Sequence, residues 1–428
     1  MQRRNFLLGA SAFAASGAGI AGWRYWPEQG LWNPCGARLP GRLAGHELVA
    51  AAWEGIDPAQ FWDTHAHLAG TGDSGGGIWL NPRMQSVFSP AEYLRRIFFL
   101  NAGCAHEAAG SVDRAYVERM HNLIDGLRPG TKMMLYAFER AYDETGRADL
   151  ERTAFYVPNG YARDTARAHP RYFEWIASIH PYRADCVEAL AEARRDGARG
   201  VKWLPAAMGI DPASPLCDRF YAALARENLP LISHAGEERA VVGHYAHDLG
   251  NPLRLRRALD AGVRVVVAHC ASMGTDRDLD RGENGPYVAS FGLFARMMDD
   301  PRHANRLFGD ISAITQINRA GAALASILAR ADWHARLLNG SDYPLPGLMP
   351  VFSVEYLVSI GLLDASAAPI LSEIRTYNPL LFDFVLKRHV RSASHAFDAQ
   401  VFRTRDFFAD PPRLERLARR GDPSRVPS

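Results

Sequence analysis

The chain has 428 residues, of which 47% are hydrophobic, so it can bury a large core. Its 49 basic and 47 acidic residues nearly balance, and no basic excess points to nucleic acid as a partner. None of the 5 cysteines forms a CxxC pair, which argues against a zinc knuckle or a dense disulfide framework. Cys35 and Cys104 could still pair in an oxidising compartment.

The N-terminus resembles a twin-arginine export signal. Arg3 and Arg4 precede Phe6 and Leu7, and an uncharged run rich in Ala, Gly and Ser continues to Gly22. We therefore expect residues 1–22 to be a signal for the twin-arginine export machinery of a bacterium, and the protein to be periplasmic. The alternative is a chance basic N-terminus on a short anchor. No clear cleavage motif precedes Trp23, so membrane attachment through an uncleaved signal is also possible.

Residues 23–58 are rich in Pro, Gly and Trp and are predicted to be a linker packed on the surface. From there on, short apolar runs alternate with helical stretches, the pattern of βαβ units. Repeated right-handed crossovers predict an α/β fold, a (β/α)8 TIM barrel over residues 59–390. The expected strands are Gln60–His65, Lys132–Phe138, Phe173–His180, Gly200–Leu204, Pro230–His234, Val263–His269, Arg306–Ile311 and Arg336–Asp342.

The longest connection follows the first strand. It contains the glycine-rich segment Gly70–Gly77 and two predicted helices, around Ala91–Leu100 and Asp113–Leu127. Excursions of this length usually cover a binding site. The barrel is followed by a helical tail, and residues 391–428 are predicted to be a C-terminal extension with an Arg-rich end.

Histidine, lysine and aspartate recur at the ends of the predicted strands, where a barrel of this kind carries its active site. Positions i and i+2 of a strand share a face, so the first two histidines can address one ion. Imidazole and carboxylate together suit zinc and similar divalent ions. The predicted metal ligands are His65 and His67 on the first strand, Lys202 on the fourth, His234 on the fifth, His269 on the sixth and Asp342 on the eighth.

The motifs around these residues resemble the metal-dependent amidohydrolase superfamily, in particular its amidohydrolase-related branch, from about Gln60 to about Lys387. The resemblance implies that Asp342 is the general base and that His269 binds a second ion or moves a proton. The matching pieces are Asp63-Thr-His-Ala-His67, Gly200-Val-Lys-Trp-Leu-Pro205, Ile232-Ser-His-Ala-Gly236, Val267-Ala-His-Cys270, Asn339-Gly-Ser-Asp-Tyr343 and Tyr377-Asn-Pro379.

Lys202 bears on the number of ions. In some members of the superfamily a lysine at this place is carboxylated and bridges two metals. A plain ammonium would repel an ion, so Lys202 is carboxylated, turned away, or used to hold an anionic substrate group. The cofactor is thus one or two divalent ions, with zinc expected, and two if Lys202 is carboxylated.

The expected function is hydrolysis of an amide, a lactone or another ester of a small molecule, with phosphoesters less favoured. Metal-bound hydroxide would attack, and Asp342 would take the proton and pass it to the leaving group. A decarboxylase or hydratase of the same branch is the alternative, because the motifs do not separate these classes. An exported binding barrel without catalysis is the third hypothesis.

Other residues, near the strand ends or on the long first connection, have two interpretations each. Asp310 ends the seventh strand and could orient a metal ligand by a hydrogen bond. The remaining candidates could either line the site or serve packing and solvation: His180, Glu237, Glu238, Trp79 and Arg83.

Overall fold

A computed structural model describes residues 30–106, 108–241 and 247–409. The predicted signal and the Arg-rich end lie outside these residues. Eight strands form the centre of the fold in two parallel groups, ordered β1-β3-β5 and β6-β7-β8-β11-β12. They are β1 (Trp62–His67), β3 (Lys132–Tyr136), β5 (Phe173–Ile176), β6 (Val201–Trp203), β7 (Leu231–His234), β8 (Val265–Ala268), β11 (Leu307–Asp310) and β12 (Leu337–Leu338).

Each strand overlaps one predicted range, and hydrogen bonds close the two groups into one barrel. The N–H of Lys202 in β6 donates to the carbonyl oxygen of Ala177, just after β5, at 2.8 Å. At the other junction the N–H of His67 in β1 donates to the carbonyl oxygen of Tyr343, beyond β12, at 2.8 Å. Parallel bridges occur at both places. The predicted TIM barrel is confirmed.

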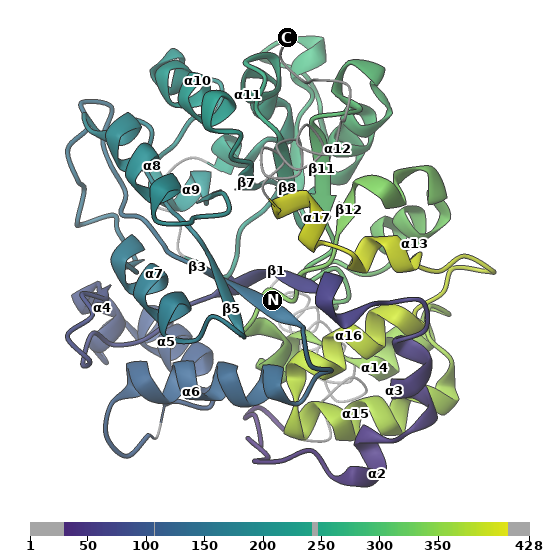
Figure 1. Cartoon of the computed structure of the whole chain (residues 1–428). Helices are drawn as coiled ribbons and strands as arrows, with labels where there is room; N and C mark the ends of the chain where they lie inside the picture. The colour runs from purple at the N-terminus through teal and green to yellow at the C-terminus, as the bar shows by residue number, and fades with distance from the viewer. Residues whose placement is uncertain (1–29, 107, 242–246, 410–428) are drawn as a thin grey trace, which may run out of the picture.

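Helices surround the strands (Figure 1). In α10 (Asp218–Glu227), three side chains are buried at the spacing of one helix face: Phe220, Tyr221 and Leu224. Asn228 ends this helix in the left-handed conformation, at φ 52°. The outer helices are α7 (Asn159–Ala168), α8 (Cys186–Arg195), α10 (Asp218–Glu227), α11 (Arg256–Asp260), α12 (Ser290–Asp299), α13 (Ala322–Ala329), α14 (Val354–Ser359), α15 (Ala368–Tyr377) and α16 (Pro379–His389). In the described part of the chain, no helix has the length and apolar character of a membrane span.

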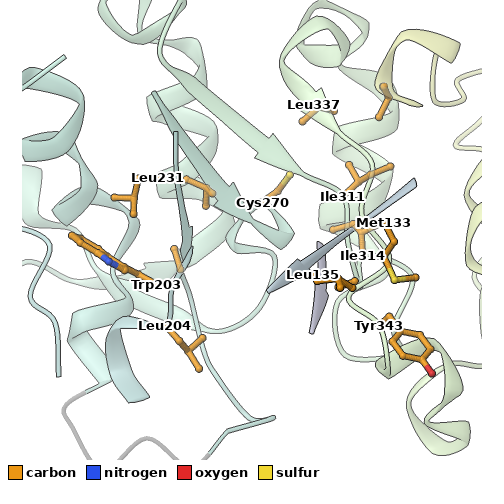
Figure 2. Close-up of a cluster of buried hydrophobic side chains, with 14 of the residues drawn as sticks. Met133, Leu135, Trp203, Leu204, Leu231, Cys270, Ile311, Ile314, Leu337 and Tyr343 are labelled. Carbon is orange, nitrogen blue, oxygen red and sulfur yellow. The ribbon is translucent and has the colours of Figure 1, made fainter. Parts of the chain in front are cut away.

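Successive side chains of each strand point to opposite faces of the barrel wall, and they form an outer and an inner apolar core. Met133, Leu135 and Trp203 belong to the outer core between strands and helices (Figure 2), where the Trp203 ring stacks on Phe220 of α10 at 5.6 Å. The inner core lies inside the barrel and consists of Trp62, Met134, Tyr136, Ile176, Ile232, Val266, Leu338 and Phe408. This inner layer is an apolar floor, and the polar strand ends lie above it.

The described part of the C-terminal extension covers the floor from below. The short helix α17 (Arg405–Phe408) places Phe407 edge-on against Phe308 of β11, with ring centroids 4.6 Å apart. The Thr404 hydroxyl accepts a hydrogen bond from the N–H of Trp62 at the start of β1, at 2.8 Å. The extension thereby seals the barrel at the end opposite the candidate site.

The excursion after β1 is folded, and both predicted helices are present. Its elements are β2 (Trp79–Leu80), α4 (Pro82–Gln85), α5 (Pro90–Ala102) and α6 (Val112–Asp125), and β2 pairs antiparallel with β4 (Phe155–Tyr156). The Asp113 carboxylate organises the glycine-rich segment. It accepts hydrogen bonds from the backbone N–H groups of Thr71, at 2.7 Å, and Gly72, at 3.1 Å. Gly72 has φ +84°, and a Cβ there would lie 2.3 Å from the carbonyl oxygen of Ile78.

The segment before β1 is partly helical, with α2 (Gly41–Ala44) and α3 (Glu47–Ala52). It buries Leu43 and Trp53 in the outer core, and the Trp53 ring lies 4.5 Å from that of Phe384 in α16. A disulfide joins Cys35 to Cys104, just beyond α5, so the bond that the sequence left possible is present. This bond ties the N-terminal segment to the excursion.

Candidate metal centre

Three predicted ligands converge at the upper end of the barrel. The distances are 3.2 Å from His65 Nε2 to His67 Nε2, 3.4 Å from His65 Nε2 to Asp342 Oδ1, and 3.3 Å from His67 Nε2 to Asp342 Oδ1. Tetrahedral ligands at about 2.0–2.1 Å from a zinc ion lie about 3.4 Å from one another. The three donor atoms therefore fit one divalent ion.

Asp342 is held rigidly beside β1. Its N–H donates to the carbonyl oxygen of His65 at 2.8 Å, and its φ of 60° is one that aspartate tolerates better than most residues. Burial alone would raise the pKa of Asp342, but the imidazoles of His269, His65 and His67 outweigh burial and hold that pKa well below its usual range. The carboxylate is therefore ionised, as a metal ligand and a base require.

Asp310 orients His65 from the side away from the cavity. Its Oδ2 lies 2.9 Å from His65 Nδ1, and its Oδ1 accepts the N–H of His269 at 3.0 Å. Burial would raise the pKa of Asp310, yet His65 and His269 lower it well below its usual range. An ionised Asp310 requires the proton on Nδ1 of His65, which leaves Nε2 free for an ion.

His269 lies on a constrained turn. His269, Cys270 and Ala271 follow β8 with φ values of 55°, 51° and 48°, a conformation that side chains rarely adopt and that marks functional sites. Nδ1 of His269 lies 3.0 Å from the carbonyl oxygen of Ser312, so this nitrogen carries the proton. Nε2 then faces Asp342 Oδ2 at 3.7 Å.

Lys202 and His234 lie beside the three convergent ligands. Nζ of Lys202 is 3.3 Å from His65 Nε2, so the lysine is not turned away from the site. Burial lowers the pKa of Lys202 to about 8. The His234 ring is 5.3 Å from that of His269, and its Nδ1 lies 3.3 Å from Glu238 Oε2. Metal binding by Lys202, His234 and His269 stays a prediction.

A cavity of about 570 Å³ opens above these residues. Its wall is largely apolar, and part of that wall comes from the excursion after β1, as the length of this connection predicted. The apolar lining includes Ile78, Leu80, Phe98, Phe99, Phe138 and Phe155.

Some secondary candidates contribute to the cavity and others do not. Glu238 lines it with a side chain only 8% exposed, so the alternative of a solvated loop is wrong for this residue. His180 is a buried structural histidine, because its Nε2 bonds the carbonyl oxygen of Met208 at 3.0 Å and it does not line the cavity. Trp79 and Arg83 are also absent from the lining of this cavity.

Sequence reasoning missed Arg319 and Gln316. Both lie in the connection after β11, line the cavity and are buried. The available signal was an arginine shortly after the end of the seventh strand, on the barrel face that carries function.

Residues 62–360 match the amidohydrolase family model. No curated protein matches the chain significantly. A TIM-barrel protein of Bordetella bronchiseptica is 16% identical over 74% of this chain and 99% of its own, with a TM-score of 0.43. A 5-carboxyvanillate decarboxylase of Sphingomonas paucimobilis is 11% identical over 74% and 98%, with a TM-score of 0.42. A protein described as a probable 2-pyrone-4,6-dicarboxylic acid hydrolase of Acinetobacter baumannii is 13% identical over 74% and 92%, with a TM-score of 0.39.

These solved structures carry different activities, and identities this low do not select one of them. The family model, in contrast, spans well over half of the chain and includes every residue of the candidate centre. The chain therefore belongs to the amidohydrolase family, whose members are enzymes of the TIM-barrel fold that generally bind divalent metal.

Proposed function

We propose that this protein is a metal-dependent hydrolase that cleaves an amide, a lactone or another ester of a small molecule. The observation that carries the proposal is the set of three donor atoms, on His65, His67 and Asp342, which lie 3.2–3.4 Å apart at the base of the cavity. The carboxylate and both imidazoles offer the donors that zinc prefers. An ion bound there would polarise a substrate carbonyl and lower the pKa of a coordinated water.

Asp342 and His269 are positioned to move protons during such a reaction. Asp342 is ionised, and its Oδ2 faces the unprotonated Nε2 of His269 at 3.7 Å. Asp342 can accept a proton from the attacking water, and His269 can share that proton or deliver it to the leaving group. The apolar wall of the cavity excludes bulk water and strengthens these electrostatic interactions.

A metal-dependent lyase, such as a decarboxylase or hydratase, is the second candidate. The observation that favours it is the placement of Lys202, whose unmodified Nζ would stand 3.3 Å from His65 Nε2 and oppose a second ion. A site with a single ion suits a lyase as well as it suits a hydrolase. Two ions together with a carboxylated Lys202 would favour hydrolysis.

A panel of aryl esters, lactones and N-acyl amides tests the proposal on the protein supplied with zinc. We expect hydrolysis of at least one class, and a loss of about 10²–10⁴-fold in kcat for Asp342→Asn, because the general base is removed. Asp332→Asn, on the exposed side of the fold, is the matched control and should keep full activity. Full activity in Asp342→Asn would contradict the proposal. Carbon dioxide release from an aromatic carboxylic acid, together with no hydrolysis of the panel, would establish the lyase.

We also propose that the protein is exported and works in an oxidising compartment. Two features support this location: the twin-arginine-like start of the sequence and the disulfide between Cys35 and Cys104. The double replacement of Arg3 and Arg4 by lysine should abolish export of the full chain, measured by cell fractionation. Unchanged export would contradict the signal assignment.

A further inference from the structure

A lysine and an aspartate are buried together in α16, beside the turn that carries Asp342. Lys387 is fully buried and Asp383 is 1% exposed, and the two lie one helical turn apart. Nζ of Lys387 donates a hydrogen bond to Asp383 Oδ2 at 2.6 Å. The other oxygen, Asp383 Oδ1, is buried and has no hydrogen-bond partner among the described residues. The carboxylate is thus only partly satisfied.

An ion pair in this environment is a poor source of stability. Taking two charges out of water can cost more than their mutual attraction returns, unless further hydrogen bonds satisfy both groups. Burial raises the pKa of Asp383 to about 7, although the charge of Lys387 opposes this rise. The contacts that Lys387 makes outside its own helix indicate a different role.

Lys387 reaches from α16 to the turn after β12. Its Nζ donates to the carbonyl oxygen of Gly340 at 2.6 Å. Gly340 lies two residues before the predicted metal ligand Asp342. The lysine therefore holds the backbone of the turn on which this ligand is carried.

Strand β1 holds the next two residues of the same turn. The N–H of Ser341 donates to Asp63 Oδ1 at 2.7 Å, and the N–H of Asp342 donates to the carbonyl oxygen of His65 at 2.8 Å. The turn is thus fixed by β1 at these two residues and by α16 at Gly340.

Gly340 also lies directly against His65. A Cβ built on Gly340 would be 2.6 Å from the Cβ of His65 and 3.0 Å from its backbone nitrogen. Asp342 has a φ of 60°, a conformation that persists only where surrounding contacts hold it. A displacement of Gly340 would therefore disturb two predicted ligands at once, His65 and Asp342.

We propose that Lys387 and Asp383 position the metal ligands. Lys387 fixes the turn of Asp342 through the Gly340 carbonyl, and Asp383 holds the ammonium group of Lys387 in place. The inference rests on the metal centre of the proposed function, and it applies to a hydrolase and to a lyase alike. Groups that orient metal ligands from behind change metal affinity by about 10–100-fold when they are removed.

Zinc affinity and stability, measured on the same variants, separate positioning from a purely structural role. Competition with a chromophoric chelator measures the affinity, and thermal unfolding of the zinc-free protein gives the Tm. Lys387→Met should weaken zinc binding by about tenfold or more and lower the Tm, because Asp383 is left buried without its partner. In the double variant Lys387→Met with Asp383→Leu, the Tm should return towards the wild-type value, because both charges are removed. Its zinc affinity should stay low, because the Gly340 carbonyl still lacks its donor.

The matched control is a lysine–carboxylate pair at the opposite end of the barrel. Lys132 Nζ lies 2.6 Å from Glu174 Oε1 at the start of β3. The double variant Lys132→Met with Glu174→Leu should keep the wild-type zinc affinity, because this pair does not contact the turn of Asp342.

Hydrogen exchange of the zinc-free protein gives a second readout that does not depend on metal. The backbone amides of residues 339–343 should exchange faster in the Lys387→Met, Asp383→Leu variant than in the wild type, because the turn has lost one of its attachments. The control variant should leave exchange at these residues unchanged.

Wild-type zinc affinity in the Lys387→Met, Asp383→Leu variant would overturn the inference, as would exchange at residues 339–343 that is no faster than in the wild type. If this variant does not fold, Asp383→Asn decides by the same two measurements, since a neutral amide holds the ammonium less strongly. An unchanged zinc affinity or unchanged exchange in Asp383→Asn would then contradict the inference. A wild-type protein that binds no zinc would refute the proposed metal centre, and hydrogen exchange would still decide whether the pair holds the turn.

Discussion

Asp310 controls the two histidines on either side of it. It fixes the tautomer of His65 through Nδ1 at 2.9 Å and holds the turn of His269 through the backbone N–H at 3.0 Å. Through these contacts a residue that does not face the ion determines which nitrogen of His65 is free to bind it. The neutral imidazoles and the two ionised aspartates favour a bound cation, whereas an unmodified Lys202 ammonium, 3.3 Å from His65 Nε2, would oppose it.

Asp310→Asn should weaken metal binding by about 10–100-fold, because the amide cannot hold His65 in the required tautomer with the same strength. Competition titration against a chromophoric chelator measures this affinity. Asp332→Asn provides the surface control, since Asp332 pairs only with Arg330 in the described structure. An unchanged affinity in Asp310→Asn would show that Asp310 has no orienting role.

At this scale the sequence was sufficient to predict that His65, His67 and Asp342 come together, and insufficient for their surroundings. His65, His67 and Asp342 could be predicted because their motifs sit at strand ends, where barrel geometry dictates convergence. Arg319 could not, because it lies in a connection without periodicity, and only the folded chain shows that its Nε has no partner among the described residues. The contact of His234 Nδ1 with Glu238 Oε2, at 3.3 Å, likewise depends on side-chain positions that no pattern encodes.

Each strand of the barrel divides its side chains between two layers. In β7, Leu231 faces the outer core, whereas Ile232 joins the inner floor and His234 ends the strand above that floor. The same alternation explains why the strands were predictable from apolar runs, although β1 extends two residues beyond the predicted range and so includes His67. Strand ends were less predictable because hydrogen bonds across the barrel, which the local sequence does not encode, decide where pairing stops.

Helix α10 offers a test of the outer core. Leu224→Ala should lower the free energy of unfolding by about 2–5 kcal/mol, since Leu224 is fully buried and truncation leaves a cavity. Leu216→Ala, at a position 44% exposed just before the same helix, should cost about 0.5 kcal/mol or less. Urea denaturation of both variants measures the difference. Equal losses would mean that α10 does not pack on the barrel as described.

The disulfide joins two elements that are distant in sequence, the N-terminal segment and the end of α5, with a separation of 69 residues. Replacing Cys35 and Cys104 by serine should lower stability by about 2–4 kcal/mol, because the unfolded chain regains the freedom of a long loop. Thermal unfolding with and without reductant provides the control: reductant should lower the Tm of the wild type and leave the double variant unchanged. A wild-type protein whose Tm does not change with reductant would contradict the presence of the disulfide.

The whole molecule places a polar centre between an apolar floor and an apolar chamber. The floor is made by the strands and is sealed by α17, and the excursion after β1 supplies part of the wall of the chamber. The barrel itself could be predicted from the alternation of strands and helices over residues 59–390. The shape and chemistry of the chamber could not, because its wall combines side chains from connections that are distant in sequence.

Metal content tests the central claim most directly. Elemental analysis of the protein purified without chelator should find about one or two divalent ions per chain. His67→Gln and Asp342→Asn should remain folded by circular dichroism and lose bound metal, while Asp332→Asn should keep the wild-type content. A wild type without bound metal that also fails to bind added zinc, or variants that retain the full metal content, would contradict the account.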